Sequence, residues 1–107
     1  MSAPARSPEE RSRALEAALA ARQERARLRV ALKSRELSPL TVLDEADDNP
    51  LWANLKVTWL LECLPGIGTV RADRILTDAQ IAPSRRIQGL GIRQRAALVA
   101  ELEREGR

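Results

Sequence analysis

A turn built from one proline and two glycines is the part of this 107-residue chain best suited to chemistry. In Leu64-Pro65-Gly66-Ile67-Gly68 the proline ends a helical pattern, and the glycines permit a tight hairpin that directs Ile67 into the core. We expect Thr69 to cap the next helix, so that the amides from Gly66 to Val70 point outward at its positive end. A cluster of outward main-chain amides is suited to binding a phosphate.

Arginines accompany this hairpin. Arg71 and Arg74 lie one turn apart on the helix that follows, while Ala72, Ile75 and Leu76 form its apolar side. The string matches the helix-hairpin-helix consensus L-P-G-I-G-x-x-x-A-x-x-I at every defining position. Because guanidinium groups match phosphate oxygens, the motif predicts sequence-independent binding of a nucleic-acid backbone. A glycine-bearing turn that only joins two packed helices is the alternative interpretation.

A second glycine pair, Gly89-Leu90-Gly91, follows later in the chain. We expect Ser84 to cap a short turn ahead of it. The polar residues on either side that we expect to contribute to binding are Arg85, Arg86, Gln88, Arg93 and Arg95. Each glycine pair opens a helix with two arginines in its early turns. The likeness predicts a pseudo-repeat with two phosphate-binding turns.

The composition excludes most catalytic and metal chemistry. The chain has no histidine and one cysteine, Cys63, so zinc sites, disulfides and Ser-His or Cys-His catalysis are excluded. We expect Cys63 to be a small buried hydrophobe, and we expect no metal and no cofactor. The N-terminus lacks an apolar signal segment, and no charge-free stretch approaches the roughly 20 residues of a membrane-spanning helix. A lone thiol favours the cytoplasm.

The residue types favour an all-α fold. Trp52 and Trp59 are the sole aromatic residues, so the core is built from Leu, Ile, Val and Ala. Ser7-Pro8 followed by Glu10 predicts a capped helix from Pro8 to about Arg35, which should project into solvent over its first half. Leu28 and Leu32 should anchor its end.

Three further helices follow from caps and periodicity, in addition to the helix after the hairpin. Ser38-Pro39 opens a short helix that ends at the acidic turn before Pro50, and a helix runs from about Val57 to Leu64. The last helix, from Ile92 to about Glu105, should end at Gly106. We expect it to pack through Ala96, Val99 and Leu102.

The charge is unevenly distributed, although the net charge is only +3. Residues 1–36 carry nine basic and five acidic side chains, residues 37–64 carry one and five, and residues 65–107 carry eight and five. The acidic middle is therefore expected to face away from nucleic acid. On the first helix, Arg22, Arg25, Arg29 and Lys33 share one face, which is interpreted as a solvated face in preference to a dedicated binding face.

The order of these segments resembles the actinobacterial integration host factor family of small nucleoid-associated DNA-binding proteins. The resemblance covers nearly the whole chain. It includes the long Ala/Arg-rich helix, Leu40-Thr41-Val42-Leu43, Lys56-Val57-Thr58-Trp59-Leu60-Leu61-Glu62, the hairpin, Ile81-Ala82-Pro83-Ser84-Arg85-Arg86, and Gly89-Leu90-Gly91 with Arg93-Gln94-Arg95. It implies a helix-two-turn-helix domain related to that of a small-subunit ribosomal protein.

The resemblance also implies a site and partners. DNA contacts would fall on Gly66, Gly68, Arg71, Arg85 and Arg86, in a basic N-terminal helix (1–36) followed by a helical DNA-binding domain (37–107). Many members have a basic residue where this chain has Gln88, and a polar cap where it has Ile92. The implied partners are double-stranded DNA and a phage integrase or recombination complex. We expect a monomer in the nucleoid, with no membrane contact.

Three alternatives remain open on the sequence. An RNA-binding or ribosome-associated protein could use the same scaffold, although few aromatic residues argue against stacking on single strands. DNA glycosylases and ligases borrow this hairpin, but the chain offers neither room for a base pocket nor catalytic groups, so we expect no enzyme. A helix bundle for protein interaction would leave the arginines dispensable.

Overall fold

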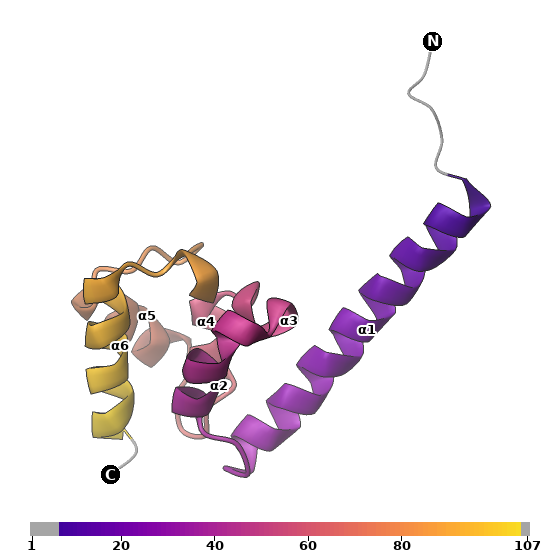
Figure 1. Ribbon diagram of the computed structural model, residues 1–107. Helices are drawn as coiled ribbons and strands as arrows, with labels where there is room; N and C mark the ends of the chain where they lie inside the picture. Colours follow the sequence, from indigo (N-terminus) through magenta and orange to yellow (C-terminus); the bar gives the residue numbers. More distant parts are fainter. Residues whose placement is uncertain (1–6, 106–107) are drawn as a thin grey trace.

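The computed structural model describes residues 7–105, and it is helical throughout, as predicted (Figure 1). The N-terminal half of helix α1 (Pro8–Lys33) projects from a bundle of shorter helices, and its C-terminal end joins the bundle. The bundle contains α2 (Pro39–Glu45), α3 (Pro50–Ala53), α4 (Val57–Glu62), α5 (Thr69–Asp78) and α6 (Ile92–Glu105). Two 3-10 turns, η1 (Ala46–Asp48) and η2 (Ile87–Gly89), complete it. Within residues 7–105, extended pairing is limited to one antiparallel bridge between Lys56 and Arg86.

Helix α1 begins where its capping signals predicted. The Ser7 hydroxyl accepts the Glu10 amide at 3.2 Å, and Pro8 takes the first helical position. The helix ends at Lys33, two residues earlier than expected, because Arg35 adopts a left-handed φ of 67°. Leu28 and Leu32 are its buried residues, which confirms that its end alone joins the core. No helix within residues 7–105 is both long and apolar enough to cross a membrane.

The segment between α1 and the hairpin contains two short elements that were not predicted, the turn η1 and helix α3. Ser38 caps α2 as expected, accepting the Leu40 amide at 3.2 Å. Helix α3 was not predicted: Asn49 accepts the Trp52 amide at 3.2 Å, and Pro50 opens a single helical turn. Helix α4 begins at the predicted residue and ends at Glu62.

The core lies where the end of α1 meets α2, α4, α5 and α6. Its fully buried large side chains are Leu28, Leu32, Leu43, Leu60, Leu61, Leu76, Ile87 and Leu98, with Val42 and Val57. On α6 the predicted packing residues are confirmed at Leu102 and in part at Val99, but the prediction was wrong at Ala96 and missed Leu98. Ala96 is exposed and Val99 is only partly buried, whereas Leu98 and Leu102 are buried. The expected end at Gly106 falls outside the described residues.

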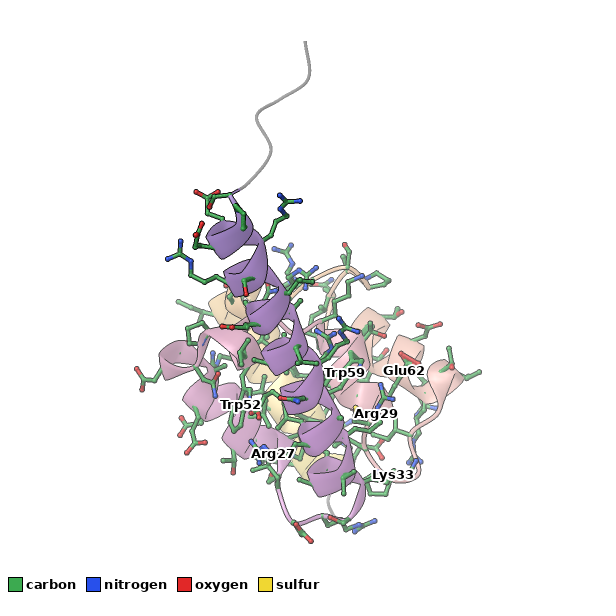
Figure 2. The ribbon with its side chains drawn as sticks, turned by 90° about the vertical axis from the view of Figure 1, so that its right-hand side faces the viewer. Arg27, Arg29, Lys33, Trp52, Trp59 and Glu62 are labelled. Atoms are coloured by element: carbon green, nitrogen blue, oxygen red, sulfur yellow. The ribbon has the colours of Figure 1, made fainter. Side chains whose placement is uncertain are left out.

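A polar clasp holds α1 against α3. The Trp52 indole N–H donates to Glu24 Oε2 at 2.6 Å, and Arg27 donates two hydrogen bonds to the same carboxylate at 2.9 and 2.8 Å. Arg27 lowers the pKa of Glu24 most, and Trp52 adds to this against the opposing effect of burial. The clasp lies on one side of α1 in Figure 2, with Trp59 and Arg29 on the other. It therefore fixes the direction in which the cations of α1 point.

Candidate nucleic-acid interface

The predicted hairpin is present between α4 and α5. The Ile67 amide donates to the Leu64 carbonyl at 3.3 Å, and Gly66 has a φ of +79°. Proline at the second turn position and a left-handed glycine at the third are typical of a type II turn. The Ile67 side chain is 8% exposed, so it is part of the core as predicted.

Gly68 has a different role from the one expected. Thr69 is the first residue of α5, and Gly68 itself is the N-cap, so the expected Thr69 cap is wrong. With a φ of −93°, Gly68 adopts a conformation open to any residue. A β-carbon at this position would meet no atom of residues 7–105 within 4 Å. The backbone is therefore open to close approach by a ligand from outside the chain.

Most of the amides predicted to form the nest are unpaired, except that of Ile67, which donates within the turn. Among the described residues, the amides of Gly66, Gly68, Thr69 and Val70 have no acceptor. Three of these four amides belong to the N-cap and first turn of α5, where the helix dipole favours an anion. Val70 is 84% exposed, which leaves this end of the helix accessible.

Arg71 bends back over the hairpin. Its Nη1 donates to the Gly66 carbonyl at 3.3 Å, and its Nη2 lies 2.8 Å from Glu105 Oε2 at the end of α6. About half of the Arg71 side chain stays exposed, so its remaining donors can reach a ligand. Arg74, one turn later, is also exposed. Ala72, Ile75 and Leu76 face inward as predicted.

The second turn does not repeat the amide nest, and that expectation is wrong. The Gly89 amide donates to the Arg86 carbonyl at 2.9 Å, and the Leu90 amide donates to the Ile87 carbonyl at 3.2 Å. The Gly91 amide donates to Gln94 Oε1 at 3.0 Å. All three amides are satisfied within the protein. The glycine pair therefore offers no free amide, and an anion at this turn would contact side chains or the first-turn amides of α6 at Ile92 and Arg93, which have no acceptor among the described residues.

Two arginines supply those side chains. Arg85 Nη1 donates to the Gly89 carbonyl at 3.0 Å, and Arg86 Nη1 donates to the Asn54 carbonyl at 2.6 Å. A β-carbon on Gly89 would lie 3.2 Å from Arg85 Cδ, so this glycine makes room for the folded arginine. Each guanidinium has five N–H donors, and both side chains are exposed, which leaves donors for a ligand.

The backbone around the arginine pair is fixed by pairing with the segment before α4. The Val57 amide donates to the Arg85 carbonyl at 3.0 Å, and the Ile87 amide donates to the Leu55 carbonyl at 2.9 Å. The 3-10 turn that follows begins at Ile87 with Arg86 as its N-cap. The expected Ser84 cap is therefore wrong. Long-range backbone bonds hold the pair in place instead.

The two arginines in the first turn of α6 differ in what they contact. Arg93 is exposed in the first turn, close to the second glycine pair. Arg95 donates to the Leu43 carbonyl and lies 3.9 Å from Asp47 Oδ1, so it ties α6 to the end of α2. This interaction engages part of the Arg95 guanidinium within the protein, and a third of the side chain stays exposed. No local sequence signal marks a contact between residues so far apart.

The two turns lie at opposite ends of α5 and α6. Gln94 Nε2 donates to the Gln80 carbonyl at 2.8 Å, while Arg71 pairs with Glu105, so the two helices are antiparallel. A ten-residue helix such as α5 spans about 15 Å, which separates the hairpin from the second turn. A groove of about 430 Å³ opens beside the second turn, and its polar lining includes Arg25, Lys56, Arg86 and Gln88. The first two were not predicted as site residues.

These features together define a small helix-two-turn-helix protein with an exposed amide nest and a separate arginine pair. Residues 32–102 match the family model of the S13-like H2TH domain. The chain is 43% identical over 103 residues to an integration host factor of Mycolicibacterium smegmatis, covering 96% of this chain and 98% of the relative. It is 44% identical over 105 residues to an integration host factor of Streptomyces coelicolor, covering 98% and 94%.

A solved structure agrees with these matches. It is described as sIHF bound to an 8-base-pair palindromic DNA, and it is 43% identical with a TM-score of 0.73. The match covers 84% of this chain and 97% of that one. The chain belongs to the integration host factor family of S13-like H2TH proteins.

Proposed function

We propose that the protein binds duplex DNA through its phosphate backbone, with little reading of base sequence, and shapes chromosomal DNA as a nucleoid-associated protein. The observation that carries the proposal is the nest formed by the exposed amides of Gly68, Thr69 and Val70, which have no acceptor among residues 7–105. Main-chain amides recognise a phosphate whatever base it carries. The DNA-bound relative supports duplex DNA as the ligand.

The contacts divide into two groups. At the hairpin, the amide nest binds one phosphate, with Arg71 and Arg74 beside it. At the second turn, Arg85 and Arg86 bind a second stretch of backbone, and Gln88, Arg93 and the glycine pair border it. Because the groups lie about one α5 length apart, a single duplex that engages both is held in a fixed orientation.

The wider role follows from this mode of binding. A protein that binds phosphates at two separate sites can bend DNA or stabilise a bent conformation without catalysing a reaction. We propose that it does so as a monomer. We place its action in the nucleoid of the cytoplasm. We also propose that the protein acts within a recombination complex that contains a phage integrase.

Competition between nucleic acids tests the proposal. A labelled duplex bound to the protein is challenged with unlabelled duplex DNA, single-stranded DNA or structured RNA of equal length. Duplex DNA of unrelated sequences should compete about equally and better than the other two. More effective competition by structured RNA would favour an RNA-binding role, for which the family relatives give no support.

A further inference from the structure

Three cations of α1 follow one another along the side of the helix that faces the second turn and the hairpin. Arg25, Arg29 and Lys33 are spaced four residues apart, so each lies about 6 Å beyond the last along the axis. All three are exposed. They extend along the part of α1 that is anchored by Leu28 and Leu32, so their positions are set by the core.

Each cation is placed against a different part of the bundle. Arg25 lines the groove that also contains Lys56 and Arg86, next to the second turn. The Arg29 guanidinium lies 5.7 Å from the centre of the Trp59 ring. Lys33 is on the same side of α1 in Figure 2, toward the chain that leads into the hairpin.

The surroundings of Cys63, which follows α4, support this placement of Arg29 and Lys33. Burial raises the pKa of the Cys63 thiol, while Arg29 and Lys33 both act to lower it, so both cations are near the end of α4. Cys63 lies three residues before Gly66. The cations of α1 therefore cover the distance between the two turns that hold the proposed DNA contacts.

We propose that Arg25, Arg29 and Lys33, together with Lys56 and Arg86, form a cationic track that binds a continuous strand of duplex DNA between the second turn and the hairpin. The inference rests on the proposed function and extends its site to α1. From Arg25 to Lys33 the axis of α1 covers about 12 Å, which matches the rise of three to four phosphates of one strand along the duplex axis. The track makes α1 part of the binding surface, whereas its charge pattern indicated only a solvated face.

One acidic residue on this side opposes the track. Glu62 is exposed on α4 and faces the same side as Arg29 and Lys33 in Figure 2. It accepts a hydrogen bond from Thr58 Oγ1 at 3.4 Å. A carboxylate here repels phosphate, so its removal should strengthen binding. Glu24, the other acid beside the groove, is already neutralised by Arg27.

A pair of charge-matched variants tests the track. Arg25→Gln combined with Lys33→Gln should weaken duplex binding about tenfold and reduce the magnitude of the salt slope by about 1.8, since two fewer phosphates are neutralised. Arg11→Gln combined with Arg13→Gln removes the same charge from the part of α1 that precedes the buried residues. This control should change the affinity less than twofold. Glu62→Gln should bind about two- to threefold more tightly.

Quenching of tryptophan fluorescence tests the track in the unmodified protein, without any substitution. Trp52 is 7% exposed and Trp59 only partly buried, so acrylamide should quench mainly Trp59. Saturating duplex should reduce this quenching, because a strand on the track covers Trp59. Unchanged quenching at saturation would overturn the inference.

The outcomes separate the track from the proposed function. If the Arg25/Lys33 variant binds like the unmodified protein while an Arg85→Ala and Arg86→Ala variant loses affinity, the track is wrong and the proposed function stands. Equal losses in the Arg25/Lys33 variant and its control would also overturn the track, because they would reflect overall charge. Failure of the unmodified protein to bind duplex DNA would refute the proposed function itself.

Discussion

Replacing Gly68 with aspartate separates the amide nest from positive charge in general. Gly68 has a φ of −93°, and an added β-carbon meets no atom within 4 Å in the described part of the chain. Aspartate is a favoured N-cap residue, and its charge suits the positive end of α5. The free energy of unfolding should therefore stay constant or rise by a few tenths to about 1 kcal/mol. For a domain of this size the Tm would rise by at most about 4–8 °C.

The affinity for duplex DNA should fall in the Gly68→Asp variant, although its stability is kept or increased. The new carboxylate would occupy the nest formed by the amides of Gly68, Thr69 and Val70, which then cannot bind a phosphate. A hydrogen bond to a charged group contributes about 1.5–3 kcal/mol, so loss of one or two costs roughly 2–4 kcal/mol. That corresponds to an affinity for duplex DNA about 30-fold to several hundredfold weaker.

Two variants control for side effects in this assay. Ser7→Asp places the same new charge at the N-cap of α1, far from the hairpin, and should reduce the affinity less than threefold. Gly68→Asn has nearly the same shape without the charge, and its loss of affinity should be intermediate. Affinity is measured by fluorescence anisotropy with labelled duplex, and folding by circular dichroism melting. A folded Gly68→Asp protein with unmodified affinity would refute the amide nest as a phosphate site.

Three further predictions concern the second turn, the clasp and the core. Arg85→Ala combined with Arg86→Ala should weaken gel-shift binding to all duplex sequences equally, by roughly 1–3 kcal/mol for each arginine–phosphate hydrogen bond removed, with the dichroism spectrum still helical. A strong preference for one sequence in this variant would argue against backbone binding. Because the pKa of Glu24 is lowered by folding, Glu24→Gln should lower the Tm at neutral pH, and this difference should disappear as the pH falls through the lowered pKa. A difference that persists in acid would contradict the ion pair. Leu98→Ala should cost about 2–5 kcal/mol of stability by chemical denaturation, against little for Ala96→Ser, and equal costs would contradict the observed packing of α6.

Local signals were sufficient to predict most of the helices. Ser7-Pro8 and Ser38-Pro39 each combine a capping hydroxyl with a proline at the first position, and both helices begin there. Helix α3 was missed because Asn49-Pro50 ends one periodic pattern and has only a single turn in which to start another. A one-turn helix leaves no periodicity to detect.

The site was predicted in part, and two errors had local causes. Thr69 was expected to be the cap because it carries a hydroxyl, but Gly68 has the extended backbone of an N-cap. The second amide nest fails because Gln94 takes the Gly91 amide, and a glutamine three residues after the cap is a signal the sequence does contain. The glycine pair of the second turn therefore resembles the hairpin in its residues, but its own amides are satisfied within the protein.

Contacts between distant residues account for the remaining differences. Arg95 bonds to Leu43 and Trp52 bonds to Glu24, and neither pair is marked by any periodicity or spacing. The position of α1 depends on the second of these contacts. For that reason Arg25 and Lys56 could be placed beside the second turn only from the structure. The division of the chain at residues 36 and 37 stays a prediction.

The salt dependence of duplex affinity tests phosphate binding most directly. Binding through the exposed arginines beside the two turns should neutralise about four to six phosphates, which gives a slope of log K against log salt of about −4 to −5. The affinity of the unmodified protein for one duplex is measured by anisotropy at several salt concentrations from low to physiological ionic strength. A linear decline with that slope is the expected result. An affinity that does not change with salt would contradict binding through the phosphate backbone.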